Sequence, residues 1–165
     1  MEHAPLPSGW RRVSLGDVAE IRTGLAKGKE VNGDAVTLPY LRVANVQDGF
    51  LDLTEVKEIS VAEREVERYR LQQDDVLMTE GGDFDKLGRG CVWESPIPTC
   101  LHQNHVFAVR TDPDKLLPRF FAHHAASPLG RLYFLSCSKQ STNLASINST
   151  QLKDCLLYTS PSPRD

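Results

Sequence analysis

The sequence predicts an α+β fold: a twisted, mixed or antiparallel sheet with short flanking helices, in a single domain. Three observations predict it. The chain has 165 residues, a length that suits one domain. Hydrophobic residues make up 40% of it and charged residues 25%, which is ordinary for a globular protein and argues against a wholly disordered one. Strand-like and helix-like segments follow one another without a clean β-α-β alternation, which favours α+β.

The N-terminal segment is expected to hold a lead-in, a helix and a loop. Residues 1–9 are proline-rich and form the lead-in. Ser14 with Asp17 resembles a capping box, which predicts a short helix over residues 15–22. Residues 23–34 contain three glycines and two lysines with little apolar content, so they predict a loop with mobile polar side chains.

A strand and a second helix follow. Residues 38–46 are β-rich and mostly apolar, and the Asp-Gly pair after them indicates a strand that ends in a turn. Ser60 with Glu63 gives another capping signal, which predicts a short, highly charged helix that ends near Tyr69.

The remainder of the chain is expected to contain further strands and then helices. The predicted strands cover residues 74–79, 91–93 and 105–110. Pro118 suits the first turn of a helix, and Pro128 ends that helix or starts the next. Residues 148–153 indicate another helix start.

Residues 81–90 form the most conspicuous loop because of their glycines. Their spacing does not match a phosphate-binding loop, and no helix is expected after Gly88, as a dinucleotide site would need. Two interpretations stay open. The segment is a contact loop that carries Lys86 and Arg89 close to a ligand, since glycine removes side-chain bulk, or it is a plain long hairpin.

Residues 100–105 offer both metal ligands and amide side chains. Cys100 and His102 share a face on a strand but His105 does not, and no fourth ligand is evident, so a zinc site is disfavoured. Gln103 and Asn104 each carry a donor and an acceptor, which is the chemistry that reads adenine edges. The alternative is that these polar residues simply end a strand.

Acidic residues in the glycine-rich loop raise the possibility of a nuclease. Glu80, Asp83 and Asp85-Lys86 resemble a carboxylate-plus-lysine set. Two-metal chemistry needs acids that converge from rigid elements, whereas these share one flexible loop, so the nuclease is disfavoured. A methyltransferase is unsupported, because neither its glycine-rich nucleotide site nor its Asn/Asp-Pro-Pro-Tyr/Phe-type motif is present.

Charge and polarity leave nucleic-acid recognition open. Net charge is −3, and residues 52–75 contribute −4, so the rest of the chain carries +1. This balance predicts no strong non-specific electrostatic binding, although part of the surface can present a positive face. Residues 138–143 place six hydrogen-bonding side chains in a row, which suits either a solvated loop or contacts to phosphates and base edges.

Cysteine usage and hydropathy indicate the compartment. The four cysteines form no Cys-x-x-Cys pair, which argues against a disulfide framework or zinc ribbon and fits reduced cytosolic thiols. No apolar run approaches the ~20 residues of a membrane span, and the N-terminus lacks the pattern of a signal peptide. The chain is expected to be cytoplasmic, with no membrane partner, no metal and no cofactor.

Several short patterns follow one another over residues 8–154. They are Gly9-Trp10 with Val13-Ser-Leu-Gly-Asp17 and Thr23-Gly24, Leu38-Pro-Tyr-Leu-Arg-Val-Ala-Asn-Val-Gln-Asp-Gly49, Leu71-Gln-Gln-Asp-Asp-Val-Leu77, Gly81 to Gly90, Gln103-Asn-His105, and Ser141-Thr-Asn143 with Ile147-Asn148 and Leu152-Lys-Asp154. In this order they resemble the N-terminal target-recognition domain of a type I restriction-modification specificity (S) subunit. Order and spacing carry the resemblance, since each pattern alone is weak. Asp74 departs from it, because the family's pattern has glycine there.

The resemblance implies sequence-specific DNA binding and no catalysis by this subunit. The family's specificity subunit carries two such domains separated by long helices, and each reads one half of a split target through the major groove. Methylation (M) and restriction (R) subunits dock on it to form an ATP-dependent endonuclease and methyltransferase complex. This chain would be a single target-recognition domain that reads one half of a bipartite site on double-stranded DNA. Alone, it is expected to bind DNA poorly.

Polar side chains on these segments are the candidate DNA contacts, through phosphates or base edges. They are Lys27, Lys29, Arg42, Lys86, Arg89, Gln103, Asn104, Lys139, Gln140, Thr142 and Asn143. The large apolar side chains are expected in the core. They are Trp10, Leu15, Tyr40, Trp93, Phe107, Phe120 and Phe121.

The expected boundaries follow from the same reasoning. Residues 10–154 form the target-recognition domain, as a fragment of a longer subunit. Residues 155–165 lack periodicity and resemble a translated sequencing adapter, so they are expected to be a non-native read-through tail; the alternative is a natural disordered tail. Two other function classes stay open: a protein-interaction module whose acidic residues 52–75 bind a basic partner, and a metal-dependent nuclease.

Overall fold

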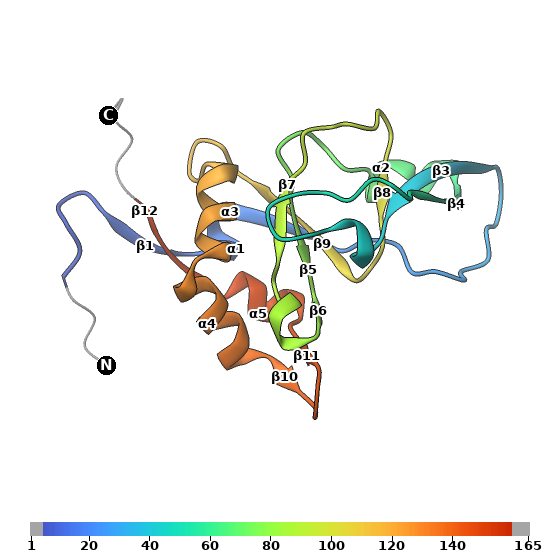
Figure 1. The fold of residues 1–165 in the computed structure, drawn as a ribbon. Helices are drawn as coiled ribbons and strands as arrows, with labels where there is room; N and C mark the ends of the chain where they lie inside the picture. The colour runs from blue at the N-terminus through green and yellow to red at the C-terminus, as the bar shows by residue number, and fades with distance from the viewer. Residues whose placement is uncertain (1–4, 160–165) are drawn as a thin grey trace.

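A four-stranded antiparallel sheet lies at the centre of the molecule, and three smaller sheets and the helices surround it (Figure 1). The computed structural model describes residues 5–159. The strands are β1 (Arg11–Ser14), β2 (Ala19–Arg22), β3 (Ala35–Leu41), β4 (Lys57–Ala62), β5 (Val76–Thr79), β6 (Gly81–Gly82), β7 (Gly90–Val92), β8 (Leu101–His102), β9 (Val106–Thr111), β10 (Lys139–Gln140), β11 (Ala145–Ser146) and β12 (Leu156–Thr159). The helices are α1 (Leu15–Val18), α2 (Val66–Tyr69), α3 (Pro118–Ala126), α4 (Pro128–Cys137) and α5 (Ser149–Lys153), with 3₁₀ turns η1 (Val43–Asn45), η2 (Glu63–Glu65) and η3 (Phe84–Lys86).

Most strand pairs are antiparallel, and one sheet is mixed. The central sheet has the order β2-β9-β5-β7 and is antiparallel throughout. In the second sheet, of order β4-β3-β8, strand β3 runs parallel to β8 and antiparallel to β4. The two remaining sheets have the orders β10-β11-β6 and β1-β12. The prediction of an α+β fold with a mixed sheet and short helices is confirmed.

Strand β5 lies inside the central sheet and is buried in all four residues. Asp75, immediately before it, is fully buried and accepts hydrogen bonds from Nε and Nη2 of Arg110 at 2.8 and 2.9 Å. The same carboxylate accepts a bond from the backbone N–H of Gln72 at 2.8 Å. The hydrogen bond to Asp75 raises the pKa of Arg110, so the guanidinium stays charged. Because an unpaired buried charge is costly, this pair fixes the start of β5 against β9.

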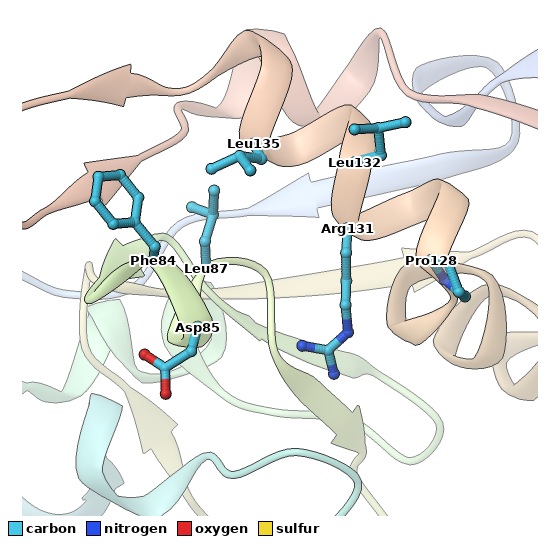
Figure 2. A pocket seen from close by; sticks show the side chains of 7 residues that line it. All are labelled: Phe84, Asp85, Leu87, Pro128, Arg131, Leu132 and Leu135. Carbon is cyan, nitrogen blue, oxygen red and sulfur yellow. The ribbon is translucent and has the colours of Figure 1, made fainter.

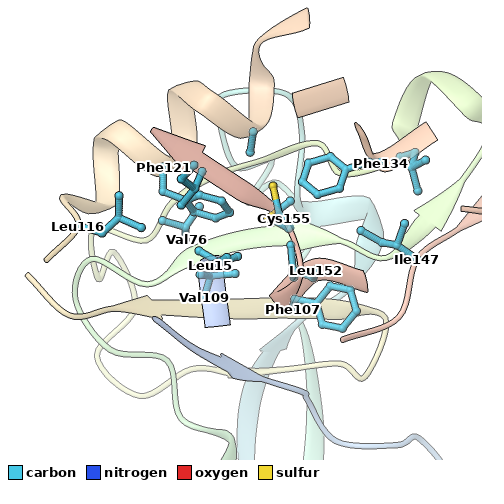
Figure 3. Close-up of a cluster of buried hydrophobic side chains, with 14 of the residues drawn as sticks. Leu15, Val76, Phe107, Val109, Leu116, Phe121, Phe134, Ile147, Leu152 and Cys155 are labelled. Carbon is cyan, nitrogen blue, oxygen red and sulfur yellow. The ribbon is translucent and has the colours of Figure 1, made fainter. Parts of the chain in front are cut away.

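The largest hydrophobic cluster lies between the central sheet and the helices (Figure 3). Side chains from α1, β9, α3, α4 and α5 meet there. Leu15, Phe107, Phe121, Phe134 and Leu152 are each at most 2% exposed. Five of the expected core residues are buried and those predictions are confirmed: Leu15, Tyr40, Trp93, Phe107 and Phe121.

The core predictions for Trp10 and Phe120 are wrong. Trp10 is 38% exposed and Phe120 is 39% exposed. Trp10 comes just before β1, which belongs to a two-stranded sheet at the edge of the molecule. Phe120 is next to Phe121 on α3, and neighbouring helical residues point about 100° apart. Only Phe121 therefore faces the core.

The expected helix over residues 15–22 is one turn long. Helix α1 ends at Val18, and the side chain of Ser14 makes no capping bond. Residues 19–22 instead form β2, which pairs with β9 from Ala19 opposite Thr111 onward. Pairing with a long buried strand outweighs the weak local preference for helix. The expected strand over residues 38–46 is also shifted: β3 ends at Leu41 and η1 follows.

The second expected helix forms from Glu63 to Tyr69, but its predicted cap at Ser60 lies in a strand. Ser60 lies inside β4, which pairs with β3 over six residues, and its hydroxyl is 3.0 Å from that of Thr37. Cross-strand hydroxyl pairs of this kind stabilise a sheet. Helical backbone begins only at η2 and continues through α2 to Tyr69.

The later elements agree more closely with the sequence. Strands β5, β7 and β9 lie within one or two residues of the predicted ranges. Pro118 and Pro128 both occupy the first turn of a helix. Asn148 caps α5 by accepting a hydrogen bond from the Gln151 N–H at 2.9 Å, and the Gln151 side chain completes the capping box.

Residues beyond the expected domain boundary at 154 take part in the fold. Strand β12 pairs with β1, with Leu157 opposite Val13. Cys155 and Leu157 are at most 1% exposed and belong to the main hydrophobic cluster. Residues 160–165 lie outside the described residues. The boundary at 154 and the non-native origin of the tail stay predictions.

Asp74 has a φ of 70°, in the left-handed region that favours glycine. The glycine of the family pattern at this position is therefore a backbone requirement, which aspartate meets better than most residues. Asp74→Gly is expected to raise the free energy of unfolding by about 0.5–1 kcal/mol. Asp74→Val, which adds a β-branched side chain at positive φ, is expected to lower it. Urea unfolding of both variants checks this, and destabilisation by the glycine variant would contradict it.

Candidate nucleic-acid interface

Three segments far apart in the sequence meet where β5 ends and surround a hollow of about 430 Å³. The first is the start of the glycine-rich loop, the second is the beginning of β9, and the third is the β10–β11 hairpin. The lining residues are Val43, Glu80, Gly81, Gly82, His105, Lys139, Gln140, Ser141, Leu144, Ala145 and Ser146. The hollow therefore combines acidic, basic, amide and hydroxyl groups with three apolar side chains, of which Val43 comes from η1.

Glu80 is fixed at the centre of this arrangement by its backbone and its side chain. Its N–H donates to the carbonyl of His105 at 3.1 Å, and its carbonyl accepts from the N–H of Ile147 at 2.8 Å. Its carboxylate accepts a hydrogen bond from Nδ1 of His105. Glu80 thus joins all three segments, since β6 follows it directly and β11 precedes Ile147.

Close backbone approach explains the glycine at position 81. Strand β6 pairs with β11, with Gly81 opposite Ser146. A Cβ atom at Gly81 would lie 2.2 Å from the carbonyl oxygen of Ala145, far closer than real contacts. A side chain here would push the hairpin away from the loop.

The rest of the glycine-rich loop is tied to the end of β5. The buried hydroxyl of Thr79 donates to the carbonyl of Lys86 at 2.7 Å, and the N–H of Thr79 bonds to the carbonyl of Arg89 at 3.0 Å. Gly88 has a φ of 69° and packs against Phe134, so a Cβ atom would clash with that ring at 2.8 Å. Hydrogen bonds to Thr79 and packing against Phe134 therefore fix the conformation of the loop.

Gln103 and Asn104 form a turn that bridges two other segments. The N–H of Gln103 donates to Leu41 and that of Asn104 to Leu25, at 2.9 and 3.0 Å. Gly24 allows this approach, because a Cβ atom there would lie 2.1 Å from the carbonyl of His102. The turn leads directly into His105, which lines the hollow, whereas the half-buried Gln103 and Asn104 are not among the lining residues.

The structure separates the predicted DNA contacts into groups. Lys139 and Gln140 line the hollow, and Thr142 and Asn143 are exposed at the tip of the same hairpin. Three predicted cations are instead paired with acids of the chain. These pairs are Lys29 with Glu65 at 3.3 Å, Arg42 with Glu55 at 3.7 Å and Lys86 with Asp83 at 2.5 Å.

The remaining two cations differ in exposure. Lys27 is exposed, in the loop after Leu25. Arg89 is half-buried, and its Nε, like that of Arg42, is buried with no hydrogen-bond partner among residues 5–159. All the assignments to DNA contact stay predictions.

The sequence did not assign Glu80 and His105 as a pair in this site. The sequence suggests Glu80 as a nuclease acid, and His105 as a metal ligand or as part of the Gln103-Asn-His105 pattern. Two of the loop acids bond to different partners, Glu80 to His105 and Asp83 to Lys86, so they do not converge on one site. Among residues 5–159, no group of three or more His, Cys, Asp or Glu side chains is placed to hold a metal ion. The Glu-Gly-Gly sequence was the available signal that a backbone contact follows Glu80.

A second hollow, of about 340 Å³, lies between η3 and α4 (Figure 2). Its walls are mostly apolar, from Phe84, Leu87, Leu132 and Leu135. Arg131 at its edge donates a hydrogen bond to Asp48 at 2.6 Å. This hollow offers few groups that could read a base edge, so it is not the candidate interface.

The architecture is that of a loop-bearing α+β domain, in which a rigid sheet holds binding residues on its loops. No family model matches the chain. It is 29% identical over 147 residues to the type I restriction enzyme StySPI specificity subunit of Salmonella potsdam, covering 88% of this chain and 31% of that protein. It is 25% identical over 154 residues to the putative type I restriction enzyme MjaX specificity subunit of Methanocaldococcus jannaschii, covering 92% and 36%. The chain is thus a homologue of type I restriction enzyme specificity subunits.

Solved structures share the fold. The HsdS subunit from Thermoanaerobacter tengcongensis superposes with a TM-score of 0.66 at 22% identity, covering 96% of this chain and 35% of that one. A chain from a structure of complex assembly and conformational transition of the type I R-M system gives 0.64 at 20% identity, covering 98% and 36%. The chain spans about a third of the length of these relatives, the size of one target-recognition domain. The predicted resemblance, to a specificity subunit and not to a catalytic one, is confirmed by the sequence relatives.

Within the part of the chain that the structure describes, none of the helices combines the length and apolar character needed to span a bilayer. The longest, α4, has 10 residues, about half of what a span requires.

His102 gives the stability of this region a pH dependence. It is 1% exposed, its ring is 2.7 Å from the Val106 carbonyl through Nδ1, and burial lowers its pKa to about 4. Between this value and the ~6.5 of a free histidine, the unfolded chain binds a proton that the folded chain does not. The free energy of unfolding therefore decreases as the pH is lowered below 6.5, and near pH 4 protonation of His102 in the unfolded chain has reduced it by about 3 kcal/mol.

Urea unfolding at pH 7 and pH 4.5 measures this loss. In His102→Asn, whose amide can still donate to Val106, the loss between the two pH values is expected to be smaller than in the wild type. Equal losses in the two proteins would show that His102 is not the responsible group.

Gly81→Ala is expected to lower the free energy of unfolding by about 1–3 kcal/mol, because β11 must move away from β6. The same shift breaks the bond from the Ile147 N–H to Glu80, so hydrogen exchange at Ile147 should accelerate. Gly28→Ala is the control for hydrogen exchange: nothing lies within 4 Å of its Cβ position, and the strain from its φ of 85° falls in a different loop, so exchange at Ile147 should stay unchanged. Unchanged exchange at Ile147 in Gly81→Ala would contradict the packing argument.

Proposed function

We propose that this chain binds double-stranded DNA sequence-specifically and reads one half of a bipartite target for a type I restriction-modification complex. The observation that carries the proposal is the hollow at the end of β5, where three segments with hydrogen-bonding side chains converge in a homologue of specificity subunits. Binding residues on loops that a rigid sheet supports are the usual arrangement for recognition.

The chemistry of these segments suits base and phosphate contacts. Amide side chains of Gln103, Asn104 and Gln140 offer the donor–acceptor pairs that match adenine edges in the major groove. Lys139 is exposed at the hollow and suits a phosphate or guanine contact. Thr142 and Asn143 are exposed at the tip of the short β10–β11 hairpin, where their side chains can also bond to DNA.

The proposed partners are double-stranded DNA and the methylation and restriction subunits of the same system. The chain supplies specificity in this scheme, and the reactions on DNA belong to those subunits. A net charge of −3 and several internal ion pairs leave little non-specific attraction to DNA. Affinity then depends on joining two half-site readers, because linkage raises the effective concentration of the second.

Selection from a pool of randomised duplexes at low salt tests the proposal with the full chain. Sequencing of the bound fraction is expected to show preferred bases at a few adjacent positions. Equal recovery of all sequences would overturn the proposal and favour the protein-interaction module instead.

Lys139→Ala is expected to weaken binding to all sequences alike and to reduce the slope of log affinity against log salt by about 1, as loss of one phosphate contact does. Lys115→Ala is the matched control, because Lys115 follows the far end of β9 and is also exposed. Fluorescence anisotropy over a salt series measures both slopes. Equal slopes in the two variants would remove Lys139 from the interface.

A further inference from the structure

Glu80 places a carboxylate in the surface that is proposed to bind DNA, where a negative charge is unexpected. Glu80 lines the hollow together with Lys139 and Gln140, and its side chain is 32% exposed. Near a phosphate an ionised carboxylate is repelled, so it gains nothing from the DNA backbone. It becomes useful only where the DNA presents a hydrogen-bond donor.

The position of Glu80 is more tightly fixed than that of an ordinary surface acid. Both backbone groups are hydrogen-bonded, to His105 and Ile147, and the residue follows directly on the buried strand β5. One carboxylate oxygen, Oε1, is bonded to Nδ1 of His105. The other, Oε2, has no hydrogen-bond partner in the described part of the chain, residues 5–159.

Stability does not account for this pair. The side chains of Glu80 and His105 are 32% and 51% exposed, and exposed ion pairs contribute little to folding. What the bond does is hold the carboxylate in one orientation. A preoriented acceptor loses less entropy when a ligand binds.

The chemistry of the DNA grooves then selects the ligand. An ionised carboxylate only accepts hydrogen bonds. In the major groove the only donors on base edges are the exocyclic amino groups, N4 of cytosine and N6 of adenine. Guanine and thymine present acceptors there, which a carboxylate repels.

We propose that Glu80 is a specificity-determining residue that accepts a hydrogen bond from the exocyclic amino group of a cytosine or adenine, with His105 as its positioning residue. The inference rests on the proposed function, since it assumes that the hollow meets the major groove. It assigns one base position of the half-site to one side chain. Lys139 beside it offsets the charge of the carboxylate near the DNA.

The first experiment needs no variant. Selection with the wild-type chain identifies a position at which adenine or cytosine is preferred. At that position the base is then replaced by an analogue without the amino group, purine for adenine or 2-pyrimidinone for cytosine. Removal of the amino group is expected to weaken wild-type binding by roughly 5- to 150-fold, the usual range for one base contact.

Variants then assign that loss to Glu80. Glu80→Ala removes the acceptor, so it is expected to bind the natural and amino-free duplexes within about twofold of each other. Glu80→Gln keeps an amide oxygen that accepts a hydrogen bond, so it should retain part of the preference for the amino group. Asp85→Asn is the control, because it removes an equal charge from an exposed residue of the same loop and should keep the wild-type preference. Thermal unfolding of each variant shows whether it is folded.

His105 is tested by its conservative replacements. His105→Asn keeps a donor near the position of Nδ1 and should retain most of the preference for the amino group. His105→Ala leaves the carboxylate unheld and should reduce that preference without changing the base that is preferred. A purely structural role would affect unfolding temperature in both and the preference in neither.

The outcomes separate the two proposals. If the wild type shows no base preference at any position, the proposed function fails and the inference with it. If the wild type has preferences that Glu80→Ala leaves intact, DNA reading stands and the role of Glu80 is overturned. If the amino-free analogues bind the wild type as tightly as natural bases at every adenine and cytosine position, the role of Glu80 is likewise overturned.

Discussion

The structure depends on a single buried strand that is fixed at both ends. Strand β5 is flanked by β9 and β7, and none of its residues is exposed to solvent. At its start Asp75 is held by Arg110, and at its end Thr79 holds the glycine-rich loop through its hydroxyl. Because a buried charge or hydroxyl is costly when unpaired, neither end can slip in register. The candidate interface begins one residue later, so the same constraint that orders the core also orders the site.

The sequence predicted those elements whose signals are local. Prolines marked the first turns of α3 and α4, and Asn148 with Gln151 capped α5. The predictions from sequence were wrong where pairing with a distant strand determines the secondary structure. Residues 19–22 have the pattern of a helix continuation but pair with β9, and residues 57–62 contain a false cap but pair with β3. A strand pairing across 90 residues leaves no trace in a local window, whereas a capping residue acts within one turn.

The site was predictable in part for the same reason. Lys139 and Gln140 follow from composition, since a run of polar side chains is visible in the sequence. Glu80 and His105 required the fold, because the hydrogen bonds that fix Glu80 join it to His105, 25 residues further on, and to Ile147, 67 residues further on. The ion pairs that occupy Lys29 and Arg42 also required the fold, whereas Lys86 pairs with Asp83 only three residues away. Counting cations in a sequence therefore overestimates the charge that a surface offers to DNA.

These internal ion pairs and the glycine contacts favour selectivity over affinity. A surface with many free cations binds any duplex, because phosphates look alike in every sequence. In this chain several cations already have acidic partners, and the groups left at the hollow are amides, hydroxyls, one lysine and a fixed carboxylate. Gly81 allows the hairpin to approach Glu80 closely enough for both to contribute to one hollow. A site of this composition gains little from the DNA backbone and most from a matching base edge, which is what a half-site reader needs when a second reader supplies the remaining affinity.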